Sequence, residues 1–319
     1  MNLNKLKILK GDASFRTFYR NIYKNKSSII VYSKKEKKFN LLIYDAVNKI
    51  LNKNDIKSPN LISENYKKNF IQIEDFGNTT VYKSLLRSKN KKIFYFKKII
   101  KLLCKLQKIK TKSVKAFDNT TYKIPIYSKK KLLNESMLFI EWYLPEFFKG
   151  KNKKLLKKKL IKIFKNLLNN LKYKKKIFVH RDFHVSNIMI TKNGFGLIDS
   201  QDAVYGNIAY DLASLIDDVR FYTNNNEKND ILKIFLRKNK FLNKKNFKND
   251  FDILSVLRNL KIIGIFTRLS KRDKKNKYLK LIPHAWKLIE NRMNNNKKFK
   301  DLKTILDKNF PIDIRKNAN

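Results

Sequence analysis

The chain has 319 residues, of which 42% are hydrophobic and 32% charged, a composition typical of a folded protein. Its formal net charge of +49 favours anionic ligands over cationic ones and keeps nucleic acid among the partners to be considered. The single cysteine, Cys104, excludes an internal disulfide and a cysteine metal cluster, and no stretch reaches the 18 apolar residues of a membrane-spanning helix.

The positive charge is spread along the sequence rather than gathered in one segment. Runs of lysine such as 34–38 and 172–176 fall in predicted turns and on polar helix faces. This distribution favours a solvated basic surface over a dedicated nucleic-acid site. The first residues lack the apolar run of a signal peptide, so we expect a cytoplasmic protein.

The first 80 residues predict a small lobe that combines strands with one helix. Phe15–Ile22 and Ser27–Ser33 have the composition of two strands of a hairpin, joined by the turn YKNK. Apolar residues recur at helical spacing over Phe39–Leu51, and Leu61–Ser63 with Phe70–Ile73 predict a second strand pair. The sequence EDFG at 74–77 then marks a hinge, so we expect a nucleotide-binding lobe over 1–78 and a catalytic and acceptor-binding lobe over 79–319.

From about residue 79 onward the apolar spacing is mainly helical. A loop is expected over 110–130, where helix signals are few. Helices are predicted over Lys91–Lys108, Lys131–Phe148, Lys153–Lys172, Ile208–Phe221, Asn229–Arg237, Phe251–Ser270, Tyr278–Asn294 and Asp301–Lys308.

The stretch 177–218 carries the chemistry. In it, His180-Arg181-Asp182 is followed by Asn187, the H-R-D-x-x-x-x-N spacing of a kinase catalytic loop. Asp199 ends the predicted strand Phe195–Ile198, and a tight turn joins this strand to Ile188–Ile190. Asn187 and Asp199 are therefore expected to converge on one ion, and Mg²⁺ suits such sparse oxygen ligation. The pattern predicts phosphoryl transfer to an alcohol.

Three further polar residues of this stretch are candidates for lining or supporting the site. His184 either lines the acceptor site or braces the loop, and His180 is a candidate for a hydrogen-bonded core residue. Asp211 opens a predicted helix, where a carboxylate more commonly supports the catalytic loop than reacts.

The same residues carry a resemblance to a known family. H-x-D-x-x-x-x-N, then I-D and D-x-A, resembles the aminoglycoside phosphotransferase and choline kinase superfamily. Within it, the chain resembles bacterial anomeric kinases of N-acetylmuramate and N-acetylglucosamine, which act in cell-wall sugar recycling. The blocks that carry this closer likeness are GDASFRTFYR, IEDFG, FIEWYL, HRDFHVSNIM, LIDSQDAVYGNIAYDLASL and LKIIGIFTRLSKRDKKNKYL.

The resemblance implies an α+β, protein-kinase-like bilobal fold with a small β-rich N-terminal lobe and a larger, mainly helical C-terminal lobe. It implies ATP and Mg²⁺ as cofactors, with Asp182 as catalytic base and Asn187 and Asp199 as metal ligands. It also implies a phosphate-covering loop containing Gly11, Asp12 and Ser14, and an adenine contact near Glu74 and Phe76. The strand SSIIVYSKKEK lacks the usual V-A-I-K signature, which leaves Lys34 or Lys35 as candidates for the phosphate-pairing lysine.

The acceptor is predicted from weaker signals. The net charge opposes cationic acceptors and favours a neutral or carboxylate-bearing sugar. Trp142 has an aromatic face for a sugar ring, and Arg268 has a cation for a carboxylate, although core packing and a solvated helix end explain them as well. Alternatives are another small alcohol as acceptor, such as an amino alcohol, a homoserine-like amino acid or an aminoglycoside, or a basic nucleic-acid-binding protein on a kinase scaffold.

Overall fold

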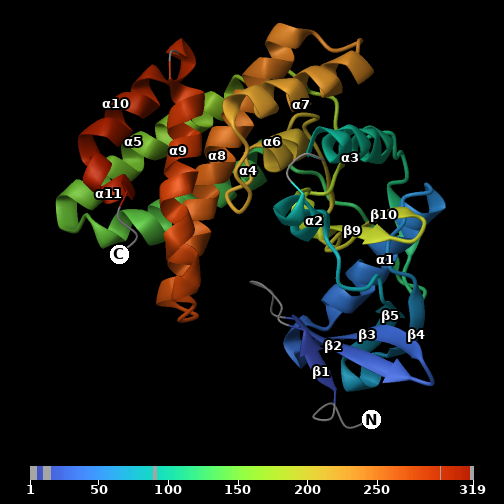
Figure 1. Cartoon of the computed structure of the whole chain (residues 1–319). Coiled ribbons are helices and arrows are strands. Elements are labelled where there is room, and N and C mark those ends of the chain that lie inside the picture. Colours follow the sequence, from blue (N-terminus) through green and yellow to red (C-terminus); the bar gives the residue numbers. More distant parts are fainter. Residues whose placement is uncertain (1–5, 10–15, 89–91, 295, 317–319) are drawn as a thin grey trace. The chain divides into compact units, whose positions relative to one another are not determined.

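The computed structural model describes residues 6–9, 16–88, 92–294 and 296–316 (Figure 1). The chain forms two compact units. The first contains Met1–Pro125 and Ile177–Tyr205, and the second contains Ile126–Lys176 and Gly206–Asn319. The division at residue 78 into two lobes stays a prediction.

An antiparallel sheet organises the first unit. Its strand order is β1-β2-β3-β5-β4. The predicted hairpin of β2 and β3 is present, and its turn residues Lys24 and Asn25 both have positive φ, as a two-residue hairpin turn requires. The strands span Lys7–Leu9 (β1), Arg16–Tyr23 (β2), Lys26–Ser33 (β3), Leu61–Asn65 (β4) and Phe70–Glu74 (β5).

Helix α1, Phe39–Lys53, packs its apolar side on this sheet. Its periodic apolar residues meet the alternate inward residues of the two central strands, which is the packing that the helical and strand periods predict. The shared core consists of Ile29, Val31, Leu41, Tyr44, Ile71 and Ile73. The sheet and α1 thus form two packed layers with this core between them.

Two helices, α2 (Val81–Arg87) and α3 (Lys92–Leu106), follow the sheet. Thr80 caps the start of α2, since its hydroxyl accepts a hydrogen bond from Lys83 N–H. The expected loop over 110–130 contains a strand pair, β6 (Ser113–Lys115) and β7 (Thr121–Lys123). Two more pairs lie in the motif segment: β8 (Ile177–Val179) with β11 (Val204–Gly206), and β9 (Ile188–Thr191) with β10 (Gly194–Leu197).

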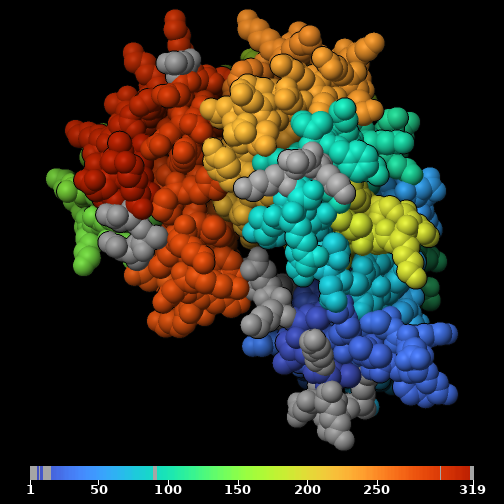
Figure 2. Space-filling view, viewed as in Figure 1, coloured from blue at the N-terminus to red at the C-terminus, as the bar shows by residue number. Residues whose placement is uncertain are grey.

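The second unit is built from helices around α8, Lys244–Lys271, which contacts α4, α6 and α9. The other helices are α4 (Lys129–Leu138), a π-helix (Phe139–Tyr143), α5 (Gly150–Asn169), α6 (Tyr210–Ile216), α7 (Asn225–Lys238), α9 (Ile282–Met293), α10 (Lys300–Asn309) and α11 (Ile312–Lys316). At the surface, α10 lies against α5 and α11 against α9 (Figures 1 and 2). Among the described residues, no helix combines the length and the hydropathy needed to cross a bilayer.

Most of these helices differ from the predicted ranges. The helix predicted over Lys131–Phe148 is divided, since α4 ends at Leu138 and the π-helix follows it. Helix α8 begins seven residues earlier than the predicted Phe251, because Asn243 accepts a hydrogen bond from Asn246 N–H and caps the polar first turns. Helix α6 ends at Ile216, short of the predicted Phe221. The carboxylate of Asp217 directly after it turns inward and takes part in a buried ion network.

Gly264 fixes the closest contact of α8. A Cβ atom built at Gly264 would lie 2.2 Å from the carbonyl carbon of Leu138, where the π-helix begins. No side chain fits there unless the backbone moves. The glycine of the block LKIIGIFTRLSKRD therefore serves helix packing.

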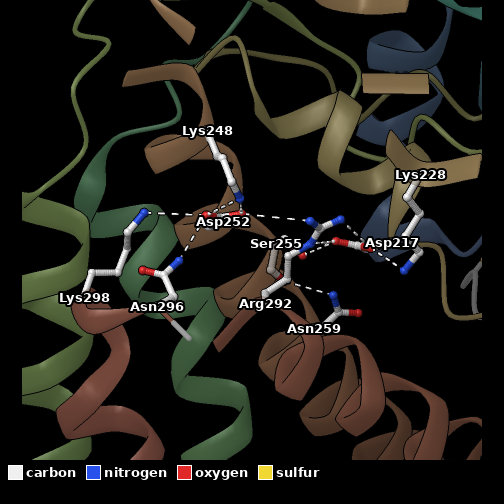
Figure 3. Close-up of polar contacts among 9 residues, drawn as sticks. All are labelled: Asp217, Lys228, Lys248, Asp252, Ser255, Asn259, Arg292, Asn296 and Lys298. Atoms are coloured by element: carbon white, nitrogen blue, oxygen red, sulfur yellow. Dashed lines mark hydrogen bonds and ion pairs between the residues drawn. The ribbon is translucent and has the colours of Figure 1, made fainter. Parts of the chain in front are cut away.

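Two buried carboxylates, Asp217 and Asp252, tie the helices of the second unit together (Figure 3). Lys228 Nζ of α7 lies 2.8 Å from Asp217 Oδ1, and Ser255 Oγ of α8 donates to Asp217 Oδ2 at 2.6 Å. Arg292 of α9 donates to both oxygens of Asp217 at 2.7 and 3.1 Å. Its guanidinium also lies 4.0 Å from Asp252, so one arginine joins the two carboxylates (Figure 3).

Charge compensation decides the ionisation of Asp217. Burial alone would raise the pKa of this carboxyl, but Arg292 and Lys228 lower it far below its usual range. A carboxyl with a depressed folded-state pKa adds stability above its unfolded pKa and loses that contribution as the pH falls.

Asp217→Asn is expected to lower the free energy of unfolding at pH 7 by about 3–5 kcal/mol, because it leaves two buried cations without their anion. Below about pH 4 the wild type loses this contribution and the difference between the two proteins narrows. Chemical denaturation at both pH values measures it. Asp230→Asn, an exposed residue of α7, is the control; equal stabilities of the two variants would contradict the assignment.

Candidate active site

The predicted catalytic loop lies between β8 and β9. Arg181 within it has a φ of 73°, a left-handed conformation that costs energy in a residue with a side chain. Val185–Asn187 then form a 3₁₀ turn, in which Asn187 N–H donates to His184 O at 2.9 Å. The chain is thus tightly wound between the histidine and the asparagine of the motif.

Asp182, His184 and Asn187 lie together in this loop. Asn187 Nδ2 donates to the carbonyl oxygen of Asp182 at 3.0 Å and lies 3.4 Å from His184 Nε2. His184 Nε2 is 3.9 Å from Asp182 Oδ1. The side chain of Asp182 is 51% exposed whereas that of His184 is buried. The carboxylate of Asp182 is therefore exposed to solvent, while the side-chain amide of Asn187 closes the loop by its hydrogen bond to the Asp182 backbone.

The β9–β10 hairpin brings Asp199 to the same place. Leu197 pairs with Ile188 at the open end of this hairpin, and Ile198 N–H donates to Asn187 O at 3.0 Å. Asp199 is the next residue and has a φ of 61°. The register of the hairpin thus brings the backbone of Asn187 beside the residue that precedes Asp199, and the convergence of the two side chains on one ion stays a prediction.

Asp199 has two side-chain partners. Arg16 Nη2 of β2 donates to Asp199 Oδ1 at 2.9 Å, and Gln201 Nε2 donates to the same oxygen at 3.1 Å. The side chain of Arg16 is 4% exposed and that of Asp199 is 37% exposed. Sequence reasoning had passed over Arg16, although it stands in the block GDASFRTFYR.

His180 is fully buried, with its ring 6.3 Å from that of Phe183. Burial lowers the pKa of His180, while the carboxylates of Asp182 and Asp199 act in the opposite direction. The imidazole is therefore neutral at pH 7. These observations suit the supporting position expected of His180, and its role stays a prediction.

The donor set at the hairpin suits a hard cation. Among the described residues, no three or more His, Cys, Asp and Glu side chains are grouped to hold a metal ion by themselves. The candidate ligands are therefore only two, the side-chain amide oxygen of Asn187 and the carboxylate of Asp199. A magnesium ion fits such a set, because it keeps several waters and takes further ligands from phosphate.

The predicted hinge follows β5. Glu74 N–H donates to Asn60 O at 2.9 Å, and its carboxylate lies 3.7 Å from Lys57 Nζ. The ring of Phe76 covers the backbone of β10, since a Cβ at Gly196 would lie 2.5 Å from its Cε2 atom. The two predicted adenine-contact residues thus lie beside the hairpin that carries Asp199.

Asp75 between them binds the hinge to β2. Arg20 Nε lies 2.6 Å from Asp75 Oδ2, and Gly77 N–H donates to Asp75 Oδ1 at 2.8 Å. Burial alone would raise the pKa of Asp75, but bonds from Arg20, Ser27 and Gly77 lower it. The hinge at 74–77 was predicted from the sequence, but the ion pair of Asp75 with Arg20 was not.

Two groups of predicted site residues remain. Gly11, Asp12 and Ser14 are outside the described residues. Trp142, Arg268 and Asp211 belong to the second unit.

Within the second unit, Trp142 is half-buried in the π-helix and Asp211 is fully buried in the first turn of α6. Arg268 lies on α8. Burial, followed by the neighbouring Arg272, lowers its pKa, while Glu141 of the π-helix acts in the opposite direction. Arg268 and the π-helix that carries Trp142 are therefore neighbours, and their acceptor roles stay predictions.

Comparison with known proteins gives consistent results. The N-acetylmuramate/N-acetylglucosamine kinase of Neisseria meningitidis serogroup B is 29% identical over 283 residues, covering 86% of this chain and 81% of the relative. The enzyme of the same name from Pseudomonas aeruginosa is 25% identical, covering 88% and 81%.

A solved structure, amicoumacin kinase hAmiN in complex with AMP-PNP, Ca²⁺ and Ami, superposes with a TM-score of 0.61 at 11% identity, covering 91% of this chain and 90% of that one. The α+β, protein-kinase-like fold expected from the sequence is confirmed. A model of the family described as "Phosphotransferase enzyme family" matches residues 5–232, more than two thirds of the chain. With the kinase-like fold and a catalytic-loop motif in place, this chain belongs to the phosphotransferase enzyme family.

Proposed function

We propose that the chain is an ATP-dependent kinase that phosphorylates the anomeric hydroxyl of N-acetylmuramate, N-acetylglucosamine or both, in cell-wall sugar recycling. The observation that carries the acceptor is the likeness to two kinases named for these sugars over more than four fifths of each chain. The net charge of +49 agrees with it, because N-acetylmuramate carries a carboxylate.

The loop and the hairpin supply the chemistry. Asp182 accepts the proton of the acceptor hydroxyl, whose oxygen forms a bond to the terminal phosphorus while the bond to the leaving ADP oxygen breaks. The exposure of this carboxylate, in a loop closed by hydrogen bonds of Asn187, suits the role. Asn187 and Asp199 hold Mg²⁺, which when bound neutralises charge on the phosphates.

The nucleotide site draws on the hinge. The backbone near Glu74 and Phe76 is proposed to meet the adenine, next to β10 and Asp199. The complex of hAmiN with AMP-PNP and Ca²⁺ supports a nucleoside triphosphate and a divalent cation in this fold. Since ATP is abundant in the cytoplasm, we place the reaction there.

Acceptor recognition is assigned to His184, Trp142 and Arg268. An indole face packs on the apolar side of a sugar ring, and a guanidinium pairs with a carboxylate. Support for Arg268 comes from its position on α8, next to the π-helix that carries Trp142. A π-helix is an uncommon element that occurs frequently at functional sites.

The purified protein, given ATP, Mg²⁺ and either amino sugar, is expected to form a sugar 1-phosphate, which phosphorus NMR identifies from its anomeric coupling. A parallel screen of amino alcohols, homoserine and aminoglycosides by ADP release tests the alternative acceptors. Phosphorylation of one of these, with neither amino sugar consumed, would replace the proposed acceptor. No ADP release with any acceptor would reject the kinase.

Asp182→Asn and Asp199→Ala are expected to differ. The first removes the base and should lower kcat by about 10²–10⁴-fold with nucleotide affinity nearly intact, whereas the second should weaken Mg²⁺-dependent nucleotide binding itself. Turnover and calorimetric ATP titration measure the two effects. Asp55→Asn, a carboxylate that is 89% exposed in the first unit, is the control. Wild-type behaviour of both variants would refute the assignment.

A further inference from the structure

The phosphate-pairing cation is missing from its usual strand. Kinases of this fold place a lysine on the third strand, where it pairs the nucleotide phosphates and an acidic residue of the next helix. In β3 the lysine is Lys26, at the exposed end by the hairpin turn. Lys34 and Lys35 follow the strand and are both exposed, so neither is held toward Asp199.

Arg16 is buried directly opposite the end of β3. It pairs in register with Ser33, the last residue of that strand, so both side chains leave the sheet on the same face. Ser33 is fully buried. The Arg16 guanidinium lies 5.5 Å from the ring centre of Tyr44 and 2.9 Å from Asp199 Oδ1. A cation thus reaches the site from β2 where β3 provides only a hydroxyl.

Helix α1 presents a neutral side chain to Arg16 rather than a carboxylate. The side chain that faces Arg16 from it is Tyr44, and burial raises the pKa of this phenol to about 12, so it is neutral. The carboxylate of the next residue, Asp45, pairs instead with Lys49 at 2.8 Å. The usual ion pair between strand and helix is replaced by an arginine that packs on an aromatic ring and binds Asp199.

We propose that Arg16 is the phosphate-pairing cation of this enzyme. The inference rests on the proposed function insofar as it requires a bound nucleotide. A guanidinium has five N–H donors in one plane, so it can hold Asp199 with one edge and a phosphate oxygen with another. A lysine at position 33 would have reached the same place from the neighbouring strand.

Binding of ATP in the presence of EDTA tests this assignment. Arg16→Met is expected to weaken metal-free ATP binding by about ten- to a hundredfold, the loss of one charge-assisted hydrogen bond. Lys34→Met and Lys35→Met remove the same charge from exposed positions and should change the affinity by no more than about twofold. Calorimetric titration measures all four proteins. Wild-type affinity of Arg16→Met would overturn the assignment.

The double variant Arg16→Ser, Ser33→Lys moves the cation across the strand pair. It is expected to recover most of the affinity that Arg16→Met loses, and a thermal melt checks that each protein is folded. A folded double variant that binds ATP no better than Arg16→Met would count against the inference. If the wild type failed to bind ATP even with Mg²⁺ present, the proposed function would fall instead.

A background lacking Asp199 separates phosphate contact from mere positioning of the carboxylate. In Asp199→Ala, adding Arg16→Met should still weaken metal-free ATP binding by a similar factor. If Arg16 acted only through Asp199, its substitution would have no further effect in this background, and the assignment would be wrong.

Discussion

The backbone hydrogen bond from Ile198 N–H to Asn187 O extends the β9–β10 ladder one step beyond its last pair, Leu197 with Ile188. Through this bond, the end of the predicted catalytic loop lies beside the residue that precedes Asp199, the predicted metal ligand. A shift of register by one residue would turn Asp199 to the opposite face. The candidate site therefore depends on the pairing of two four-residue strands.

Acidic residues act as organising centres in this strongly basic chain. With only 26 Asp and Glu against 75 Lys and Arg, the basic side chains far outnumber the acidic side chains that could pair with them. Three carboxylates each bind cations from other elements: Asp75 fixes the hinge through Arg20, Asp217 joins α7 and α9 through Lys228 and Arg292, and Asp199 holds Arg16. Structure is specified by where the few negative charges lie, more than by the many positive ones.

Local patterns predicted much of this molecule. Periodicity and turn signals located the β2–β3 hairpin, α1 and the β9–β10 hairpin, because all three depend on residues close in sequence. What escaped prediction was tertiary. The contact of Arg16 with Asp199 joins residues 183 positions apart, and nothing in the spacing of either residue encodes it. The strand pair inside the expected loop over 110–130 escaped for another reason, since each strand has only three residues.

The left-handed conformations of Arg181 and Asp199 have a consequence for how this protein can change. Each holds a φ that glycine adopts freely and that costs other residues of order 1–3 kcal/mol. Glycine at either position would relieve the backbone strain. A variant that no longer needs to be active could therefore gain stability by substitution within the candidate site. At these two positions of the candidate site, glycine would therefore suit the backbone better than the residues present.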